Sequence, residues 1–366
     1  MSSCSDVWKE KKRVVVVGGG IAGALIVKQL QFHADVILVD PKEYFEMPWT
    51  WLRAMVEPTF AERGIIDHTD YFKNGRLVTA TASSVSENEI MTSEGRYISF
   101  DYLVIATGHL DTVPMTRMQR LVTFRENHQK ISYAKSVLVI GGGPTGVEFC
   151  AELVTAFPNK KITLVHSGPR LMEFVGTKAA TKCYEWLAAR NVDILLEQTV
   201  NLEAVTEEGT YETSRGETIV ADCHFECTGR KLSSTWLQDT ILQSSLDEEG
   251  RLAVDQHLRV KGYDHIFAIG DITNITEIKQ GLYAQKHAQV AAKNIKNLLK
   301  GDKKAKLASY KPGKAIAMVT LGRKEAMAYF PFLTVVGCVP GFLKAKDYFV
   351  GRTRKQLGLE PHHHQS

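Results

Sequence analysis

The sequence of 366 residues predicts an α/β protein with two Rossmann-like dinucleotide-binding domains and a small C-terminal β/α extension. Residues 13–31 and 135–157 share one pattern: a buried apolar run, a glycine turn and a helical period. Each is followed by a second apolar strand, at 35–40 and 161–166. A strand, glycine turn, helix and strand open a nucleotide-binding half, so the repeat predicts two such halves.

Composition supports a globular chain and excludes other classes. Hydrophobic residues make up 44% and charged residues 23%, which allows sizeable cores. Lys and Arg number 45 against 41 Asp and Glu, so no nucleic-acid partner is expected. The six cysteines follow no framework spacing, which indicates reduced thiols, and no metal site is predicted.

The ends of the sequence show no targeting signal. The polar start predicts no secretory signal, and Ser2 in place of Gly excludes N-myristoylation. No stretch reaches the roughly 18 apolar residues of a membrane-spanning helix. We therefore expect a cytoplasmic protein, with peripheral contact to membranes or lipid droplets left open. Cys4 is expected to be a surface thiol, and His362–His364 a tail or an expression remnant.

The first glycine turn predicts a pyrophosphate site. Glycines at this spacing let the backbone approach the phosphates at a helix N-terminus, where free N–H groups favour anions. Asp40 ends the second strand about 20 residues later, where an acid binds ribose hydroxyls. The residues assigned to this turn are Gly18, Gly20, Ile21, Ala22 and Gly23.

The second glycine turn differs at the end of its second strand. The turn residues are Gly141, Gly143, Pro144, Thr145 and Gly146. No acid follows; His166, Ser167 and Arg170 stand there, and these side chains could accept the 2′-phosphate of NADP. This favours NADPH over NADH. The alternative is that His166 only ends a strand at the surface and binds no phosphate.

The remaining elements follow in order. After a Trp- and Met-rich stretch at 44–56, we expect short strands within 77–100 and a buried strand at 102–108. The second unit continues with a hairpin at 203–220 and a strand at 223–229. Later segments are a strand ending at Asp271, a helix at 278–300, a Lys-rich loop at 300–306, strands at 315–321 and 325–329, and a basic amphipathic helix at 342–355.

These elements predict four segments. They are residues 1–117, the first part of an FAD-binding domain; 118–242, an NAD(P)H-binding domain; 243–312, the second part of the FAD-binding domain; and 313–366, the extension. Two dinucleotide sites require two dinucleotides. One flavin and one nicotinamide are the economical pair, because hydride transfer needs the two rings face to face.

The chain resembles the pyridine-nucleotide:disulfide-oxidoreductase class of flavoproteins. Besides the glycine turns, Ala106-Thr107-Gly108, Cys227-Thr228-Gly229 and Ala268-Ile269-Gly270-Asp271 carry the resemblance. It implies FAD at the first turn, with Asp271 at the ribityl chain. It also assigns Lys42, Arg53, Ala106, Thr107, Gly108 and Gly270 to FAD, and Thr228 and Gly229 to NAD(P)H.

The cysteines argue against a disulfide reductase. The class carries Cys-x4-Cys or Cys-x2-Cys pairs, and this chain has neither. Cys223 and Cys227 stand on one predicted strand, roughly 13 Å apart, which is too far for a bridge. Strand alternation places both on one face, so we expect them in the core.

Within the class, the chain is similar to the ferroptosis-suppressor and apoptosis-inducing-factor-like branch of NAD(P)H:quinone oxidoreductases. The matching stretches are 52–54, 137–152, 163–167, 310–313, 321–323 and 344–350. The branch implies reduction of ubiquinone or vitamin K-type quinones at membranes. Its animal members begin Met-Gly and are myristoylated, unlike this chain.

The resemblance assigns three catalytic candidates. Glu148 is expected to position the nicotinamide, and Lys344 to stabilise charge on the flavin. His287 lies on a helix whose Ala284–Gln289 segment looks like a quinone-site helix. His287 could instead be an ordinary packed residue of that helix. The same holds for the stripe of Ala284, Ala288, Ala291 and Ile295, and Lys344 could instead lie on a solvated or lipid-facing surface.

We therefore predict an FAD-dependent NAD(P)H:quinone oxidoreductase that contacts membranes peripherally through its C-terminal segment. The oligomeric state stays open. One alternative is a reductase of a protein or radical acceptor, as in ferredoxin or monodehydroascorbate reductases. Another is a redox-gated signalling flavoprotein of the apoptosis-inducing-factor type.

Overall fold

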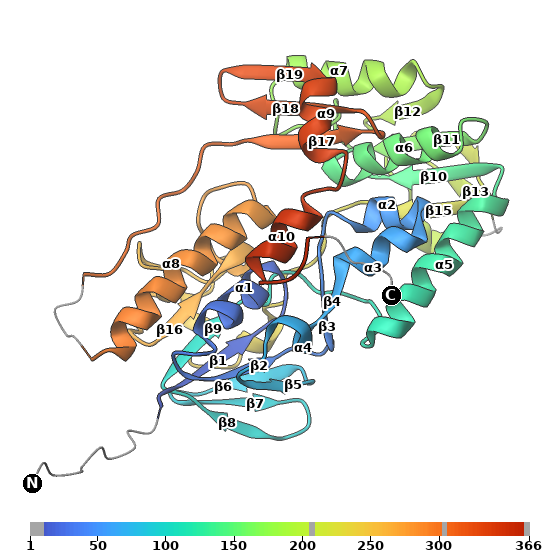
Figure 1. Ribbon diagram of the computed structural model, residues 1–366. Helices are drawn as coiled ribbons and strands as arrows, with labels where there is room; N and C mark the ends of the chain where they lie inside the picture. The colour runs from blue at the N-terminus through green and yellow to red at the C-terminus, as the bar shows by residue number, and fades with distance from the viewer. Residues whose placement is uncertain (1–10, 205–208, 302–305, 362–366) are drawn as a thin grey trace, which may run out of the picture.

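The computed structural model describes residues 11–204, 209–301 and 306–361, and its two parallel sheets confirm the predicted fold class (Figure 1). The first sheet has the order β16 (Ile266–Ala268), β9 (Tyr102–Ile105), β1 (Arg13–Val17), β2 (Asp35–Val39), β5 (Arg76–Val78). The second has the order β12 (Val192–Leu196), β11 (Lys161–His166), β10 (Ser136–Ile140), β15 (Cys223–Glu226).

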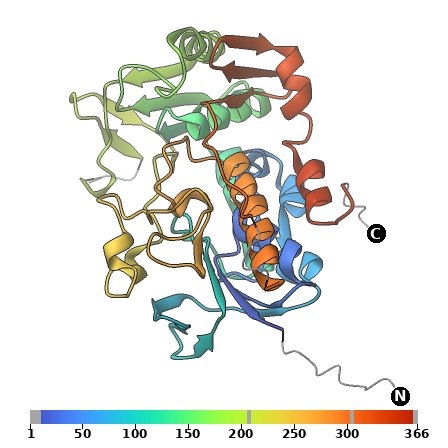
Figure 2. The same ribbon diagram turned by 90° about the vertical axis from the view of Figure 1, so that its left-hand side faces the viewer.

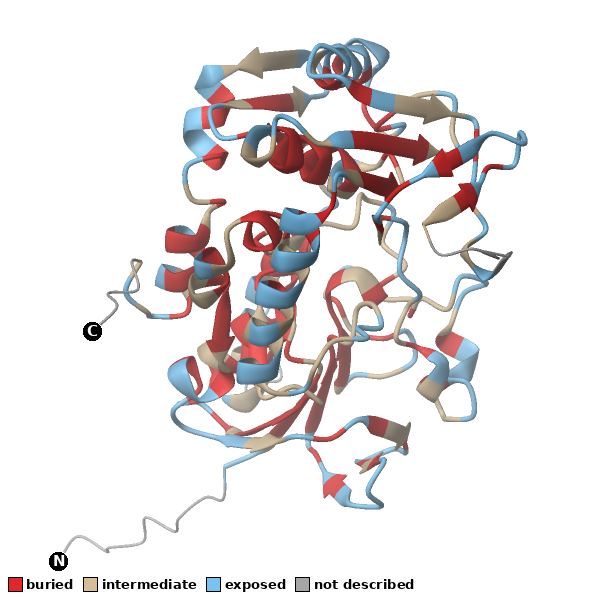
Figure 3. Cartoon of the chain, turned by 90° about the vertical axis from the view of Figure 1, so that its right-hand side faces the viewer, coloured by how far each residue is buried: buried red, intermediate tan, exposed pale blue. Residues whose placement is uncertain are grey.

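Helices cover these sheets, which explains the continuous apolar strands. The helices are α1 (Ile21–Leu30), α2 (Trp51–Val56), α3 (Ala61–Gly64), α4 (His68–Tyr71), α5 (Arg117–Tyr133), α6 (Pro144–Ala156), α7 (Thr177–Ala188) and α8 (Gly281–Leu299). Figure 3 shows the sheet strands mostly buried. The buried residues of α8 include Ala284, Ala288, Ala291 and Ile295. Short 3-10 turns span Pro58–Phe60, Leu202–Ala204, Thr235–Leu237, Gln243–Ser245 and Gly270–Ile272.

Small antiparallel sheets decorate the two halves. They are β3 (Tyr44–Glu46) with β4 (Ile65–Asp67); β6 (Ala82–Val85), β7 (Glu89–Thr92) and β8 (Tyr97–Ser99); and β13 (Thr210–Glu212) with β14 (Thr218–Val220). The domain boundaries remain a prediction. Cys223 and Cys227 are free and buried, as the alternation predicts.

The C-terminal extension contains β17 (Ala317–Leu321), β18 (Glu325–Phe330), β19 (Leu333–Gly337), α9 (Cys338–Lys344) and α10 (Val350–Gln356). Its three-stranded sheet lies beside α6 and α7, and α10 returns to α1 (Figures 1 and 2). The predicted single helix over 342–355 is wrong. Tyr348 and Phe349 have φ of 52° and 58°, a left-handed conformation that ends one helix before the next begins.

Candidate functional site

The first glycine turn joins β1 to α1 and leaves the helix N-terminus open. Gly18 has φ of 100°, and a Cβ there would lie 2.6 Å from the Ala106 carbonyl oxygen, so only glycine fits. A Cβ on Gly20, the N-cap, would meet nothing within 4 Å. No side chain caps α1, and its first turn holds no acid. The free N–H groups and this open space fit a pyrophosphate.

Asp40 stands beside the same turn and is 4% exposed. Its carboxylate accepts hydrogen bonds from the backbone N–H groups of Gly19 and Lys42, the latter at 2.7 Å. The Lys42 ammonium lies 2.7 Å from Asp111. Burial opposes the charge of Lys42, but Asp40 and Asp111 outweigh it and raise the pKa of Lys42. A buried carboxylate beside the turn fits a ribose diol, and the assignment of Asp40 to this role remains a prediction.

The second glycine turn repeats this design between β10 and α6. Gly141 has φ of 114°, and a Cβ there would lie 2.6 Å from the Cys227 carbonyl oxygen. Gly143 caps α6 in open space, and Pro144 begins the helix. His166 occupies the place of the acid, because its Nδ1 accepts the Gly142 N–H at 3.2 Å.

The other residues predicted to bind NAD(P)H differ in solvent exposure and in their hydrogen bonds. Ser167 is exposed, as are Thr228 and Gly229 after β15. The Arg170 guanidinium donates to the carbonyl oxygens of Val175, at 2.7 Å, and Glu173, at 2.6 Å. Arg170 therefore braces its own loop.

The turns that follow β9 and β15 are tied to each other. Thr107 Oγ1 donates to the Ser233 carbonyl at 2.8 Å, and the Ser233 N–H donates to the Gly108 carbonyl at 2.9 Å. Asp111 also pairs with Arg230 at 2.6 Å. These bonds hold the two connections between the halves side by side.

The turn after β16 carries Asp271. Gly270 has φ of 76°, and its N–H donates to Nδ1 of His287 at 3.0 Å. The Asp271 carboxylate lies 3.3 Å from Nδ1 of His109. His287 is 1% exposed, and its Nε2 lies 2.9 Å from Glu277. Burial lowers the pKa of His287 despite the opposing pull of Glu277, so the ring is held neutral.

Glu148 and Lys344 come from different parts of the chain and form a buried pair. Lys344 Nζ lies 2.6 Å from Glu148 Oε1 and donates to the Met318 carbonyl at 2.6 Å. Thr320 donates its N–H and its hydroxyl to the same Glu148 oxygen, at 2.7 and 3.0 Å. The extension thus brings a cation to the first turns of the helix that follows the second glycine turn.

Arg53 lies in a network beside this pair rather than at the first glycine turn. Its guanidinium lies 2.9 Å from Glu152 and donates to the Ala345 carbonyl at 2.6 Å. Tyr348 donates to Glu152 at 2.7 Å, and its hydroxyl lies 2.8 Å from that of Thr320. Burial and the two carboxylates raise the pKa of Tyr348, which keeps its proton. The network joins α2, α6 and the extension.

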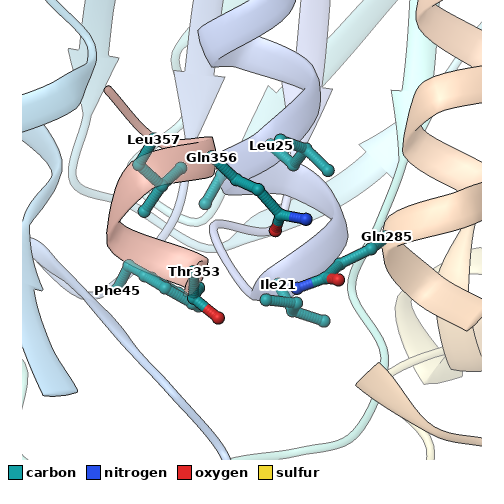
Figure 4. A pocket seen from close by; sticks show the side chains of 8 residues that line it. Ile21, Leu25, Phe45, Gln285, Thr353, Gln356 and Leu357 are labelled. Atoms are coloured by element: carbon teal, nitrogen blue, oxygen red, sulfur yellow. The ribbon is translucent and has the colours of Figure 1, made fainter. Parts of the chain in front are cut away.

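The Ala-Gln segment of α8 packs against α1 and α10. Ala284, Ala288, Ala291 and Ile295 are all buried. Gln285 borders a small pocket with Ile21 of α1 and Thr353 of α10 (Figure 4). This pocket has no room for a water molecule, so it holds no quinone in this conformation.

The structure therefore groups most of the predicted residues into four places: the first glycine turn, the second glycine turn, the Gly270 turn with His287, and the Glu148–Lys344 pair. Sequence reasoning gave no role to Glu152, Thr320, Tyr348, Glu277 or Tyr310. Most of these lie in stretches that carried the family resemblance, which was the available signal.

Comparisons with known proteins identify a matching family model, similar sequences and a similar fold. The pyridine nucleotide-disulphide oxidoreductase family model matches residues 12–293. A ferroptosis suppressor protein 1 of Xenopus tropicalis is 32% identical over 96% of this chain and 97% of its own. An apoptosis-inducing factor homolog A of Dictyostelium discoideum is 32% identical over 87% of this chain and 85% of its own. The sulfide:quinone oxidoreductase of Aquifex aeolicus superposes with a TM-score of 0.74 at 21% identity, covering 94% of this chain and 92% of its own.

Proposed function

The chain belongs to the pyridine nucleotide-disulphide oxidoreductase family, and from that premise we propose that it is an FAD-dependent NAD(P)H:quinone oxidoreductase. The family makes it an oxidoreductase that uses a pyridine nucleotide. The observation that carries the proposal is the buried Glu148–Lys344 pair, which the extension builds beside the second glycine turn. Nearly full-length relatives named ferroptosis suppressor protein 1 support the same reading.

Each cofactor has residues that would hold it. FAD would lie with its pyrophosphate on the N-terminus of α1, its ribose on Asp40 and its ribityl chain at Asp271. NAD(P)H would lie on the N-terminus of α6. Bound FAD would supply the redox chemistry, accepting a hydride from the nicotinamide and releasing two electrons to the acceptor.

The residues of the chain then have separate tasks. NAD(P)H, a quinone and one proton give NAD(P)⁺ and a hydroquinone. Glu148 holds Lys344 in place, and the Lys344 ammonium stabilises negative charge that develops during the transfer. Its fixed position means that little reorganisation is needed when the charge appears.

Anaerobic stopped-flow kinetics test this function. The yellow protein is reduced with NADPH or NADH and then mixed with a short-chain ubiquinone or a naphthoquinone. Fast bleaching followed by fast reoxidation by quinone is the expected result. Fast bleaching with slow quinone reoxidation would favour a protein or radical acceptor instead.

We propose that NADPH is preferred over NADH because His166, and no acid, receives the Gly142 N–H. Asp40 shows what an acid does at the equivalent place: it accepts the Gly19 N–H and fits a ribose diol. His166→Asp should therefore favour the free 2′-hydroxyl and repel a 2′-phosphate. We expect the ratio of kcat/KM for NADPH to that for NADH to fall at least about tenfold, which corresponds to 1.4 kcal/mol. Equal losses with both nucleotides would contradict this assignment.

We also propose that the extension contacts membranes, where long-chain quinones reside. An apolar patch covers the β18–β19 turn and α9: Phe330, Phe332, Leu333, Val339, Phe342 and Leu343 are all exposed. Lys314 Nζ lies 5.2 Å from the Phe332 ring, and Lys346 is exposed nearby in sequence. Apolar side chains beside lysines fit an anionic lipid surface. Among the described residues, no helix has the length and apolar character to cross a bilayer.

Vesicle cosedimentation tests the patch. Phe332→Glu with Phe342→Glu removes two rings that are 91% and 74% exposed. Each buried Phe is worth roughly 1.5–3 kcal/mol, so binding to anionic vesicles should weaken more than tenfold. Activity with a water-soluble quinone should persist. Tyr133→Glu, at an aromatic residue 86% exposed elsewhere, is the control and should bind vesicles as the wild type does.

A further inference from the structure

A buried carboxylate, Glu277, stands behind the Asp271 turn. Its side chain is 1% exposed. One oxygen lies 2.9 Å from His287 Nε2, and the other accepts the Tyr310 hydroxyl at 2.6 Å and the Gly313 N–H at 3.3 Å. A buried anion must be satisfied by donors: Tyr310 and Gly313 donate hydrogen bonds, and the His287 ring lies within ion-pair distance. Glu277 therefore ties its own loop to α8 and to the stretch around Tyr310 and Gly313.

Residues 306–316, here called the strap, run along one edge of the molecule and lead into β17 (Figure 1). It contains the Tyr310–Gly313 stretch that carried part of the family resemblance. Tyr310 packs edge-on against the His287 ring, with centroids 4.3 Å apart. A Cβ on Gly313 would collide with the Tyr283 ring, so glycine is required for the close approach. The stretch is thus built around Glu277 and His287.

The hydrogen bonds fix the form of His287. Because Nδ1 accepts the Gly270 N–H, the single proton of the neutral ring is on Nε2, facing Glu277. Glu277 stabilises that tautomer, as a carboxylate orients a histidine in other sites. Because Nδ1 holds the Gly270 N–H and Nε2 is buried 2.9 Å from Glu277, His287 is suited to hold a turn and not to donate a proton to a quinone.

We propose that Glu277, acting through His287, is a positioning residue for the FAD-binding turn at Gly270–Asp271. The proposal rests on the proposed use of FAD at this turn and deepens it. Loss of the carboxylate frees the other tautomer, in which Nδ1 carries the proton and cannot accept the Gly270 N–H. Asp271, the next residue, then loses its fixed place.

FAD affinity tests the proposal without any acceptor. Apoprotein is titrated with FAD, and flavin fluorescence gives Kd. Glu277→Gln should raise Kd about tenfold, because a lost positioning hydrogen bond is worth about 1.4 kcal/mol. Tyr283→Phe is the matched control: it removes a 2.7 Å bond to the Lys314 carbonyl of the strap and leaves Glu277 intact. Its Kd should stay within about twofold of wild type.

A double-variant cycle tests whether Glu277 acts through His287. The amide oxygen of His287→Asn can accept the Gly270 N–H without help from a carboxylate. Adding Glu277→Gln to His287→Asn should therefore leave Kd unchanged. Effects that multiply would mean that Glu277 acts independently, which overturns the proposal.

The pH dependence separates positioning from simple loosening. Protonated His287 cannot accept the Gly270 N–H, so Kd for FAD should rise as the pH falls. The groups facing the ring are Glu277, Tyr310, Lys279 and Asp271, and Glu277 favours ring protonation. Glu277→Gln should move the rise in Kd to lower pH, because the ring loses the carboxylate that favours its protonation. A structure that merely loosened would expose the ring to water and move the rise in Kd to higher pH. Wild-type FAD affinity in Glu277→Gln would refute this role alone; a wild-type protein that binds no FAD would refute the proposed function.

Discussion

Replacing Lys344 with Met is expected to slow quinone-dependent turnover about 100-fold, the usual loss when one preorganised charge-stabilising donor is removed. The Lys344 ammonium is 8% exposed and fixed by Glu148 and the Met318 carbonyl, so its charge is poorly screened by solvent. Met keeps the length and apolar stem of the side chain. Glu148 keeps both donors from Thr320 but loses its cation, so a lower Tm is expected as well and turnover is compared below the unfolding transition.

The measurement is kcat with a soluble quinone, together with FAD content and reduction by NAD(P)H alone. Lys346→Met is the matched control, because Lys346 is exposed and two residues away. It should retain wild-type turnover. Lys344→Arg should recover part of the rate, since it restores the charge with a different shape. Turnover of Lys344→Met within about threefold of wild type would exclude this ammonium from the chemistry.

Both glycine turns were predictable from sequence because each is a local pattern. Gly18 and Gly141 each need a positive φ, and the apolar strands around them are continuous. His166 was also singled out locally, as the residue standing where an acid is expected. The structure adds that its Nδ1 accepts a glycine N–H, as the Asp40 carboxylate does.

The long-range partners could not be predicted in this way. Glu148 and Lys344 are 196 residues apart, and Arg53 and Glu152 are 99 apart. The first contact depends on how the extension packs over α6, and the second on how α2 packs against α6. The apolar and basic pattern over 342–355 favoured one helix. Instead α9 ends at Lys344, the left-handed backbone at Tyr348 and Phe349 precedes α10, and the Tyr348 hydroxyl reaches Glu152. Tertiary hydrogen bonds outweighed local helical preference there.

Replacing Arg53 with Met should give the largest loss of stability, about 3–5 kcal/mol, the usual result of breaking a buried ion pair. Arg53 is 3% exposed and Glu152 is fully buried. Without Arg53, the Glu152 carboxylate keeps the Tyr348 hydroxyl and one weaker cation, Arg323, whose Nε is 3.4 Å away and whose side chain is 38% exposed. The Ala345 carbonyl also loses its donor. A buried charge that loses its buried partner costs far more than the intact pair contributed.

Thermal unfolding checks this, with a fall in Tm of roughly 4–7 °C for a chain of 366 residues. Arg76→Met, which removes a side chain 58% exposed in its pair with Asp35, should shift Tm by no more than about 3 °C. Adding Glu152→Gln to Arg53→Met should recover part of the loss, because it removes the orphaned charge and keeps an oxygen for Tyr348. If the double variant is less stable than Arg53→Met, the loss comes from packing and not from charge. In either case the Ala345 carbonyl stays unsatisfied beside Lys344, so turnover should fall before the protein unfolds.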